Sequence, residues 1–400
     1  MSSKGQVLAL GGLSTFGPLA LDLYLPALPQ LTDDLGTTEA LGQASMSVCM
    51  IGLAAGQLLV GPLTDRTGRR VPLLLGVALF AVSAALCAVA PSIEVLLVLR
   101  LLTGLAGATG IVIARAMVRD LYSGDEAART FSLLMIVSGA APVLAPVIGS
   151  QLMRVTDWRG LFLALAAIGV VLLGAAAARP ETLPVERRQT GGFRATGRAV
   201  VTVARDRTFV VPTLVLSLVC CAMFAYISMG SYVLQEGYGL GAQAYGIVFA
   251  VNALGIVAAG RLSAGLVRRL GPVRLLWIAV GAAVAGGVAL LVGVLAADSV
   301  WAVLPPLFVV VSSVGIVLPN GTALALAGQG AVAGSASALL GLSQFAFGAL
   351  IPPLVSTGGA TALAMALTIL GVALAGGVAA LFLPRRTVGR SVAVGDRELH

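Results

Sequence analysis

The stretch Gly17-Pro-Leu-Ala-Leu-Asp22-Leu-Tyr-Leu-Pro26-Ala-Leu-Pro29 lies in an apolar run, Val7 to Leu28, that is long enough to cross a bilayer. Asp22 is the only charged residue of that run. A charged side chain at the bilayer centre costs about 2.5–3.5 kcal/mol on insertion scales, so an acid there is expected to have a functional reason. We expect Asp22 to bind and release a proton within the membrane. The alternative is that Asp22 caps a helix end or lies at the outer interface near Pro26.

The composition excludes a soluble globular protein. The 400 residues are 58% hydrophobic and only 10% charged, whereas an average chain carries about 25% charged residues. We therefore expect an all-α integral membrane protein that crosses the bilayer several times. Only Lys4 precedes the first apolar run, and that run is too long for the apolar part of a signal peptide, so cleavage is not expected there.

Apolar stretches of membrane-spanning length recur twelve times along the chain. Small residues are frequent, with 50 glycines, and they let helices approach closely in lipid. The twelve transmembrane helices are expected near residues 6–28, 41–63, 72–91, 95–118, 131–153, 160–179, 209–235, 244–267, 273–297, 300–326, 334–357 and 359–383.

A polar segment rich in arginine separates the first six spans from the last six, and its Pro and Gly content is typical of a flexible linker. The two halves resemble each other weakly. A basic, glycine-containing turn follows the second span at 61–70 and the eighth span at 260–271, as expected of a duplicated transporter. We predict an N-terminal six-helix bundle over 1–180, a cytoplasmic linker over 181–207, a C-terminal bundle over 208–384 and a cytoplasmic tail over 385–400.

The basic residues predict the orientation. With the N-terminus inside, 22 of the 25 Lys and Arg residues fall on the cytoplasmic side. Arg154 and Arg159 are then outside, Arg100 is inside the membrane, and the outer loops carry mainly acids. The positive-inside rule therefore predicts two cytoplasmic termini. The net charge of +8 reflects this topology, and no nucleic-acid partner is expected.

We expect neither an enzyme nor a metal site. Cys49, Cys87, Cys220 and Cys221 lie in apolar runs, where cysteine behaves as a small hydrophobic residue, and the only histidine is His400. No nucleotide-binding loop or nucleophile triad is visible, so no cofactor is expected, and the energy for transport would come from a gradient. A membrane enzyme or a receptor would need a soluble catalytic cluster or an additional domain.

The loop after the second span carries a specific pattern. It has a glycine, then Asp-Arg, then Gly-Arg-Arg, and it resembles the major facilitator superfamily signature between spans 2 and 3. The resemblance implies the major facilitator fold, with twelve transmembrane helices in two pseudo-symmetric six-helix bundles. The residues that carry it are Gly61, Asp65, Arg66, Gly68, Arg69 and Arg70.

Further runs resemble the Bcr/CflA subgroup of twelve-span drug:proton antiporters. Two features depart from the subgroup. Its span-5 signature usually has Gly-Pro and ends Gly-Gly, where this chain has Ala145-Pro146 and Gly149-Ser150, and some relatives carry a second acid early in span 1, where residues 10–17 have none. The resembling runs are residues 21–29, 100–107, 141–149, 224–228, 249–255 and 334–341.

The resemblance implies a proton-coupled exporter of small amphipathic antibiotics, such as bicyclomycin or chloramphenicol-type compounds, that works by alternating access. Its partners would be the drug, protons and the lipid bilayer, and a monomer would suffice. The implied location is a bacterial plasma membrane. The alternative is a proton-coupled exporter or symporter of one specific metabolite.

Asp22 and Arg100 are the candidate proton-coupling residues. We expect Arg100, a few residues inside span 4, to interact with Asp22 directly or through water. Burial favours the protonated carboxyl and a nearby guanidinium favours the ionised one, so a balanced site can switch as its exposure to water changes. The alternative for Arg100 is snorkelling to the outer interface.

The resemblance assigns a cytoplasmic gate to residues 61–70 and Asp120. Asp65 would face the positive end of the helix that begins the eleventh span near Gly334. Arg69 would reach Asp120 at the inner end of span 4. These contacts would close the inner side in the outward-open state. The alternative is that these charges only set the topology.

Span 5 contains a set of small or helix-bending residues. We expect them to shape a bend at the interface between the halves, which would disfavour leak of solutes. Ordinary enrichment of Gly and Pro in membrane helices is the alternative. The residues are Gly139, Pro142, Pro146 and Gly149.

The drug-binding candidates are polar and aromatic residues within the spans. An apolar cavity with a few polar groups suits amphipathic drugs of varied shape. Tyr226 and Asn252 are the strongest because they lie in runs that resemble the subgroup. Each candidate can instead bridge helices or face lipid. The full set is Tyr24, Tyr226, Ser228, Asn252, Asn320, Gln344, Phe345 and Phe347.

Overall fold

The structure is a computed structural model that describes residues 3–122, 124–188, 200–297, 299–329, 333–355 and 359–383. Within these ranges the secondary structure is helical, without strands. Eight of the described helices are long and apolar enough to cross a bilayer. Large apolar side chains such as Leu75, Val171 and Trp301 are exposed, as expected of surfaces that face lipid. The predicted all-α membrane architecture is confirmed.

The first predicted span is broken into short helices. It consists of α1 (Ser3–Ser14), α2 (Phe16–Asp22), the 3-10 helix η1 (Leu25–Ala27) and α3 (Leu28–Asp34). Pro26 has no N–H to donate to the carbonyl of Asp22 and its ring crowds that carbonyl, so the α-helix cannot continue. Non-helical backbone at membrane depth is tolerated only where protein or water surrounds it. The break therefore places Asp22 at a helix end inside the protein.

The other helices follow the predicted spans. In the first half they are α4 (Glu39–Thr67), α5 (Arg70–Ala88), α6 (Ile93–Leu121), α7 (Gly124–Leu152) and α8 (Trp158–Ala177). A short 3-10 helix, η2 (Val185–Arg187), follows α8. In the second half they are α10 (Arg207–Tyr232), the π-helical η3 (Val233–Gly237), α11 (Ala242–Ala296), α12 (Val300–Leu326), α13 (Ala333–Val355) and α14 (Ala362–Ala380).

α11 contains two of the predicted spans, 244–267 and 273–297. The helix is interrupted at Gly271, whose φ of 75° and ψ of 159° are not helical. Glycine adopts this backbone conformation without the steric cost that a side chain would bring. Pro272 follows directly and begins the second arm. One residue therefore separates two spans that we expected as distinct helices.

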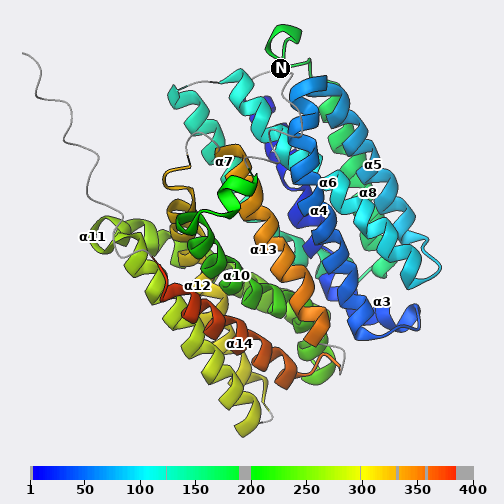
Figure 1. Cartoon of the computed structure of the whole chain (residues 1–400). Helices are drawn as coiled ribbons and strands as arrows, with labels where there is room; N and C mark the ends of the chain where they lie inside the picture. The colour runs from blue at the N-terminus through cyan, green and yellow to red at the C-terminus, as the bar shows by residue number, and fades with distance from the viewer. Residues whose placement is uncertain are drawn as a thin grey trace, which may run out of the picture.

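The two halves repeat the same close helix packing. In the first half, α4 and α6 approach so closely that a Cβ on Gly104 would overlap the carbonyl oxygen of Cys49. In the second half, α11 and α12 do the same where Gly315 meets the carbonyl oxygen of Ile256. These helices correspond to spans 2 and 4 and to spans 8 and 10. Figure 1 shows α4, α5, α6 and α8 gathered on one side and α10, α11, α12 and α14 on the other, in agreement with two pseudo-symmetric bundles.

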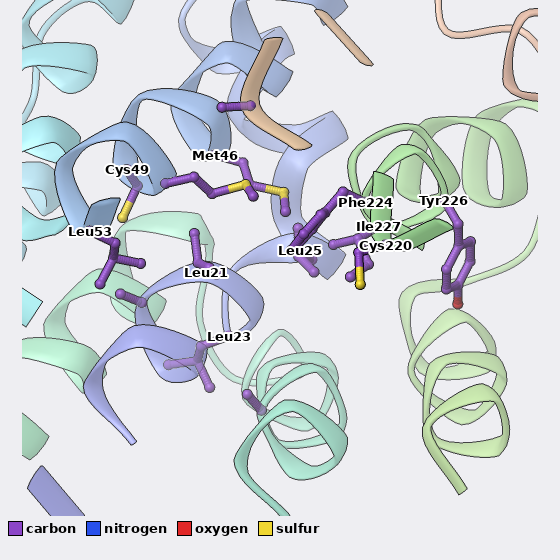
Figure 2. Close-up of a cluster of buried hydrophobic side chains, with 14 of the residues drawn as sticks. Leu21, Leu23, Leu25, Met46, Cys49, Leu53, Cys220, Phe224, Tyr226 and Ile227 are labelled. Atoms are coloured by element: carbon purple, nitrogen blue, oxygen red, sulfur yellow. The ribbon is translucent and has the colours of Figure 1, made fainter. Parts of the chain in front are cut away.

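An apolar cluster joins the two halves (Figure 2). Leu21 and Leu25 of span 1, Met46 of α4, and Phe224 and Ile227 of α10 are buried in it. In addition, α13 packs against α4, and α11 packs against α7. Asp22, whose chain neighbours Leu21 and Leu23 belong to the cluster, and Tyr226, itself a member, lie at this shared contact region.

The predicted domain boundaries stay predictions. Residues 189–199 of the predicted linker and the whole predicted tail, 385–400, lie outside the described residues. Within the described part, helices α1 to α8 and helices α10 to α14 pack mainly among themselves.

Candidate functional site

Asp22 is the last residue of α2 and is only 5% exposed. The C-terminus of a helix carries partial negative charge, so a carboxylate there gains nothing from the helix dipole. The C-cap of α2 is Leu23, and the N-cap of the following helix η1 is Tyr24. The location of Asp22 at a helix end therefore does not make it a cap.

Arg100 of α6 is fully buried and reaches span 1. Its Nη2 donates to the carbonyl oxygen of Ala20 (2.7 Å) and its Nε to that of Ser45 (3.3 Å). The guanidinium lies 4.5 Å from the centre of the Tyr24 ring. The remaining nitrogen, Nη1, has no hydrogen-bond partner among the described residues. Arg100 thus does not snorkel to the interface.

Asp22 and Arg100 do not touch directly. The ion pairs found among the described residues both belong to Arg69, so of the two forms of interaction that we expected, direct or through water, the direct one is not formed in this structure. Arg100 nevertheless lies within electrostatic range of Asp22. The two carbonyl groups that hold the guanidinium leave its positive charge in place, and a buried charge favours an opposite charge nearby. Protonation of Asp22 therefore changes the net charge of a buried site.

Tyr24 lies against Arg100, and its role in drug binding stays a prediction. Its hydroxyl and that of Ser45 share a hydrogen bond of 2.8 Å, and its ring packs 5.2 Å from that of Phe162. The residue is fully buried within the first half. Tyr24 is therefore part of the surroundings of Arg100 in this structure.

Tyr226, Asn252 and Tyr245 form a polar group in the second half. Tyr226 lies on α10 and the other two on α11, and all three are at most 3% exposed. The hydroxyl of Tyr245 lacks a hydrogen-bond partner among the described residues, and the hydroxyl of Tyr226 and the Nδ2 of Asn252 lie near each other without forming a well-aligned hydrogen bond. Phe249 packs against both tyrosines, with ring centres 5.8 Å from Tyr226 and 6.2 Å from Tyr245. Figure 2 shows Tyr226 at the edge of the apolar cluster, of which it is a member. The two strongest candidates thus lie together, and Tyr245 joins them.

Two other drug-binding candidates are already paired. Asn320 of α12 donates to the hydroxyl of Ser263 (2.7 Å) and to the carbonyl oxygen of Ile316 (2.7 Å). It therefore bridges α12 and α11, which is the alternative role that we left open. Ser228 donates to Oε1 of Gln43 (3.0 Å) and so joins α10 to α4 across the two halves.

The remaining candidates lie on α13. The ring of Phe345 is 6.1 Å from that of Phe224 on α10. Gln344 and Phe347 are half-buried on the same helix, and the carbonyl oxygen of Phe347 accepts a hydrogen bond from Cys221 (3.3 Å). Phe345 is therefore next to the apolar cluster, and a role in drug binding stays a prediction for all three.

Arg69 is the centre of the predicted gate. Its Nη1 donates to Asp65 (2.6 Å) and to Thr64 (2.9 Å), and its Nε donates to Asp120 (3.0 Å). The Arg69–Asp120 contact that the resemblance implies is therefore present. Asp65 pairs with Arg69 within the first half, and the residues around Gly334 lie outside those whose surroundings are described. The contact expected between Asp65 and the eleventh span stays a prediction.

Two physical features of the structure favour glycine at position 68. Its φ of 95° is strained for residues with a side chain, and a Cβ there would overlap the carboxylate of Glu181. By contrast, a Cβ on Gly61 would meet open space, so this structure gives no steric reason for that glycine. Arg66 lies in the last turn of α4, where the helix dipole favours positive charge.

Glu181 and Thr182, just after α8, form a clasp on the gate residues: they bind Arg69, Arg70 and Asp120. Glu181 accepts hydrogen bonds from the backbone N–H groups of Arg69 (2.8 Å) and Arg70 (3.1 Å), which begin α5. Thr182 donates to Asp120 (3.2 Å). Burial alone raises the pKa of Glu181, but the backbone N–H donors lower it, and the net pKa lies below the usual value. A carboxylate at the positive end of α5 is favourable.

Replacing Glu181 with Gln is expected to slow transport severalfold without preventing membrane insertion, because the amide presents its own N–H groups to the backbone donors. A carboxyl with a lowered pKa contributes stability above its unfolded-state pKa, and this is lost only as the pH falls through the lowered value. The defect should therefore be equal at neutral and mildly acidic pH. Initial transport rates in vesicles check this. Glu186, exposed in the same segment, is the matched control, and an equal loss in Glu186→Gln would contradict the clasp.

Gly149 of α7 lies where this helix crosses span 1. A Cβ on Gly149 would overlap the carbonyl oxygen of Leu23, the residue after Asp22. The next residue, Ser150, lies against Gly246 of α11. The departure from the usual Gly-Gly is therefore accommodated, since a glycine stands opposite the serine. α7 thus packs between the end of α2 and the start of α11.

The prolines of span 5 lie inside a continuous helix. α7 runs from Gly124 to Leu152 through Pro142 and Pro146. A proline inside a helix removes one backbone hydrogen bond and crowds the preceding turn. The bend expected from these residues stays a prediction, and the surroundings of Gly139 lie outside what the structure describes.

Hydrogen bonds between the two halves gather at one end of the molecule, and we call this set the outer latch. The hydroxyls of Thr32 and Tyr232 share a bond of 2.6 Å, and Ser231 donates to the carbonyl oxygen of Leu25 (2.6 Å). This is the end that the positive-inside rule predicts to be outside. The other members are Gln235 to Pro26 (3.0 Å), Gln243 to Ser150 (3.2 Å) and the backbone N–H of Ala360 to Glu39.

Known proteins resemble this chain along most of its length. The chain is 35% identical over 389 residues to YdgK of Bacillus subtilis, described as an uncharacterized MFS-type transporter, and the match covers 96% of both chains. It is 28% identical over 354 residues to a bicyclomycin resistance protein homolog of Haemophilus influenzae, with 88% of both chains covered. The second relative's name agrees with the predicted subgroup.

A solved structure shows the same fold. A mutant of the nucleoside transporter NupG superposes with a TM-score of 0.77 at 14% identity, over 94% of this chain and 98% of NupG. The sequence model of the Major Facilitator Superfamily matches residues 10–353. The chain therefore belongs to the major facilitator superfamily of transporters.

Proposed function

We propose that this transporter exports small amphipathic drugs, such as bicyclomycin or chloramphenicol-type compounds, in exchange for protons. The observation that carries the proposal is a carboxyl group, that of Asp22, buried at a helix break and within electrostatic range of Arg100. Acids inside a membrane mark proton or substrate pathways. The name of the Haemophilus relative supports a drug as cargo. No cofactor is required, because the proton gradient supplies the energy.

Asp22 exchanges its proton as its contact with water alternates between the two sides. Burial favours the protonated form and Arg100 favours the ionised form, so modest changes in hydration shift the balance. A proton taken up from outside and released inside returns the carrier to the state that binds drug. Drug and proton then compete for the same carrier, which is the requirement for exchange.

The outer latch supports a carrier that opens to alternate sides. With the outer ends joined, the drug-binding group is closed to the outside, and export requires these bonds to break. On the predicted cytoplasmic side, the ionic contacts of Arg69 stay within the first half. Closing that side would bring Asp65 to the second half, as the resemblance implies.

Replacing Tyr232 with Phe is expected to favour the outward-open state, because it removes the hydroxyl bonded to Thr32. A cysteine in place of the buried Met46 reports on opening, since the four native cysteines are buried. Impermeant thiol reagents added outside should label it several times faster in the Tyr232→Phe background. Unchanged labelling in Tyr232→Phe would contradict the latch.

The function is tested in inside-out vesicles with an imposed pH gradient. Uptake of bicyclomycin or chloramphenicol that requires the gradient and collapses with a proton carrier supports drug export. A drug-susceptibility panel in an efflux-deficient host widens the search. Gradient-driven movement of a single metabolite, without drug transport, would favour the alternative of a specific metabolite transporter. Transport that ignores the gradient would contradict proton coupling.

The chain is a multi-pass membrane protein, and further features of its arrangement are part of the proposal. Both termini are cytoplasmic in a bacterial plasma membrane, and a monomer is sufficient for transport. The positive-inside rule supports the orientation, because the arginines gather in the loops on one side. Reporter fusions at either terminus test it.

A further inference from the structure

Tyr245 lies where the proton site and the drug-binding group meet. The contacts of α7 with Leu23 on one side and with Gly246 on the other bring the start of α11 next to the end of α2. As a result, Tyr245 is within electrostatic range of both Asp22 and Tyr226. Its side chain is fully buried and its hydroxyl has no partner among the described residues. A buried hydroxyl without a partner is costly, so a hydrogen-bond acceptor or donor that reached Tyr245 would stabilise the site.

Arg100 supplies a second unpartnered donor within electrostatic range of Asp22. Nη1 of Arg100 on α6 is buried and unbonded. Among the described residues, Cys49 on α4 is a further titratable group in range. On α7, the described residues at this crossing, Gly149 and Ser150, are not titratable. The carboxyl is therefore within electrostatic range of a cation of the first half and of a phenol of the second half.

We propose that the Asp22 side chain moves between two partners, Nη1 of Arg100 when it is ionised and the hydroxyl of Tyr245 when it is protonated. The proposal rests on the proposed function and adds the residue by which the second half detects the proton. Tyr245 is a positioning residue in this scheme, because it acts through Asp22 and the drug.

The preference for each partner follows from charge. A carboxylate forms its strongest hydrogen bonds with a guanidinium. A neutral carboxyl group loses that attraction but can both donate to and accept from a phenol. The proton enters from the outer solution, forms the O–H bond of Asp22, and leaves to the cytoplasm when the carboxylate returns to Arg100. No other bond is made or broken.

The same hydroxyl belongs to the group that binds drug. The polar groups there, the hydroxyls of Tyr226 and Tyr245 and the amide of Asn252, can all donate a hydrogen bond, and Phe249 supplies an aromatic surface. This arrangement suits an uncharged aromatic compound with carbonyl or nitro acceptors. Protonated Asp22 withdraws Tyr245 from such a ligand, so proton uptake weakens drug binding.

Infrared difference spectroscopy of the purified protein during a pH change tests the switch without a ligand. The C=O band of protonated Asp22 is identified by its loss in Asp22→Asn. In Tyr245→Phe this band should move to higher frequency, because the phenol no longer donates to the carbonyl. In the matched control Tyr226→Phe the band should stay in place. An unmoved band in Tyr245→Phe overturns the proposal.

Chloramphenicol binding at a series of pH values gives the second readout. In the wild type, affinity should fall as the pH is lowered. Tyr245→Phe should bind about tenfold more weakly at high pH, as expected from one lost hydrogen bond, and should lose the pH dependence. Tyr226→Phe should bind chloramphenicol more weakly but keep the pH dependence of the wild type. A wild-type slope in Tyr245→Phe overturns the proposal.

The experiments distinguish a failure of the proposed function from a failure of the role of Tyr245. A wild-type protein that shows no titrating carboxyl band and no gradient-driven transport contradicts proton coupling as a whole. A wild-type protein that transports and titrates, together with a Tyr245→Phe variant that behaves identically, contradicts only the role of Tyr245.

Discussion

The variant Asp22→Asn should lose gradient-driven export completely, down to the level of vesicles without the protein. The amide is close in size to the carboxyl group, so packing at the end of α2 is retained. It cannot gain or lose a proton, and it does not offer Arg100 a negative charge. Initial uptake of drug into inside-out vesicles with an imposed pH gradient measures the effect. Exchange of labelled for unlabelled drug without a gradient should persist, because binding and alternation remain possible.

Asp33→Asn is the matched control for this result. Asp33 lies on α3 in the same broken span, carries the same charge and is exposed. Its variant should retain gradient-driven export. Export that survives in Asp22→Asn, or that is lost equally in Asp33→Asn, would remove Asp22 from the coupling scheme.

Gly149→Ala should be the most damaging of the small substitutions. The added methyl group would overlap the carbonyl oxygen of Leu23, and a backbone atom cannot move aside as the tip of a side chain can. Span 1 and α7 would separate beside Asp22. We expect a large loss of folded protein in the membrane, measured by the thermal stability of the purified transporter, and loss of export in what remains.

The control for that variant is Gly281→Ala on α11. A Cβ at this position meets nothing within 4 Å, and the residue is exposed. Replacing glycine by alanine within a helix should then be neutral or slightly stabilising. If both alanine variants have equal stability, the close approach of α7 to span 1 is not required.

The membrane architecture could be predicted from the sequence because it depends on local composition. Apolar runs of sufficient length and the position of the arginines need no knowledge of tertiary contacts. Asp22 stood out for the same reason, as one charge in a long apolar run. The Arg69–Asp120 contact came from the family resemblance, since nothing local relates residues so far apart in the chain.

The rest of the site could not be predicted, because it depends on which side chains meet across helices. Tyr24 and Tyr245 look alike in sequence, as single tyrosines in apolar runs. Packing gives the hydroxyl of Tyr24 a partner in Ser45 and leaves that of Tyr245 without one. The sequence likewise could not show that Asn320, a drug-binding candidate, bridges two helices.

The sequence around Glu181 indicated a turn but did not indicate its hydrogen-bond partners. It follows Pro180, which ends the α8 segment, so an acid could be expected at the start of a turn. That its carboxylate would accept hydrogen bonds from the first residues of α5 follows only from the fold. The break at Pro26 was equally readable, but its consequence, an acid at a buried helix end, required the structure.

Proton release on drug binding tests the exchange of proton and drug most directly. The purified transporter, in detergent with very little buffer, is mixed with bicyclomycin or chloramphenicol in the presence of a pH-sensitive dye. The wild type should release a proton when the drug binds, and Asp22→Asn should bind drug without release. Drug binding to the wild type without proton release, or equal release from the variant, would contradict the account.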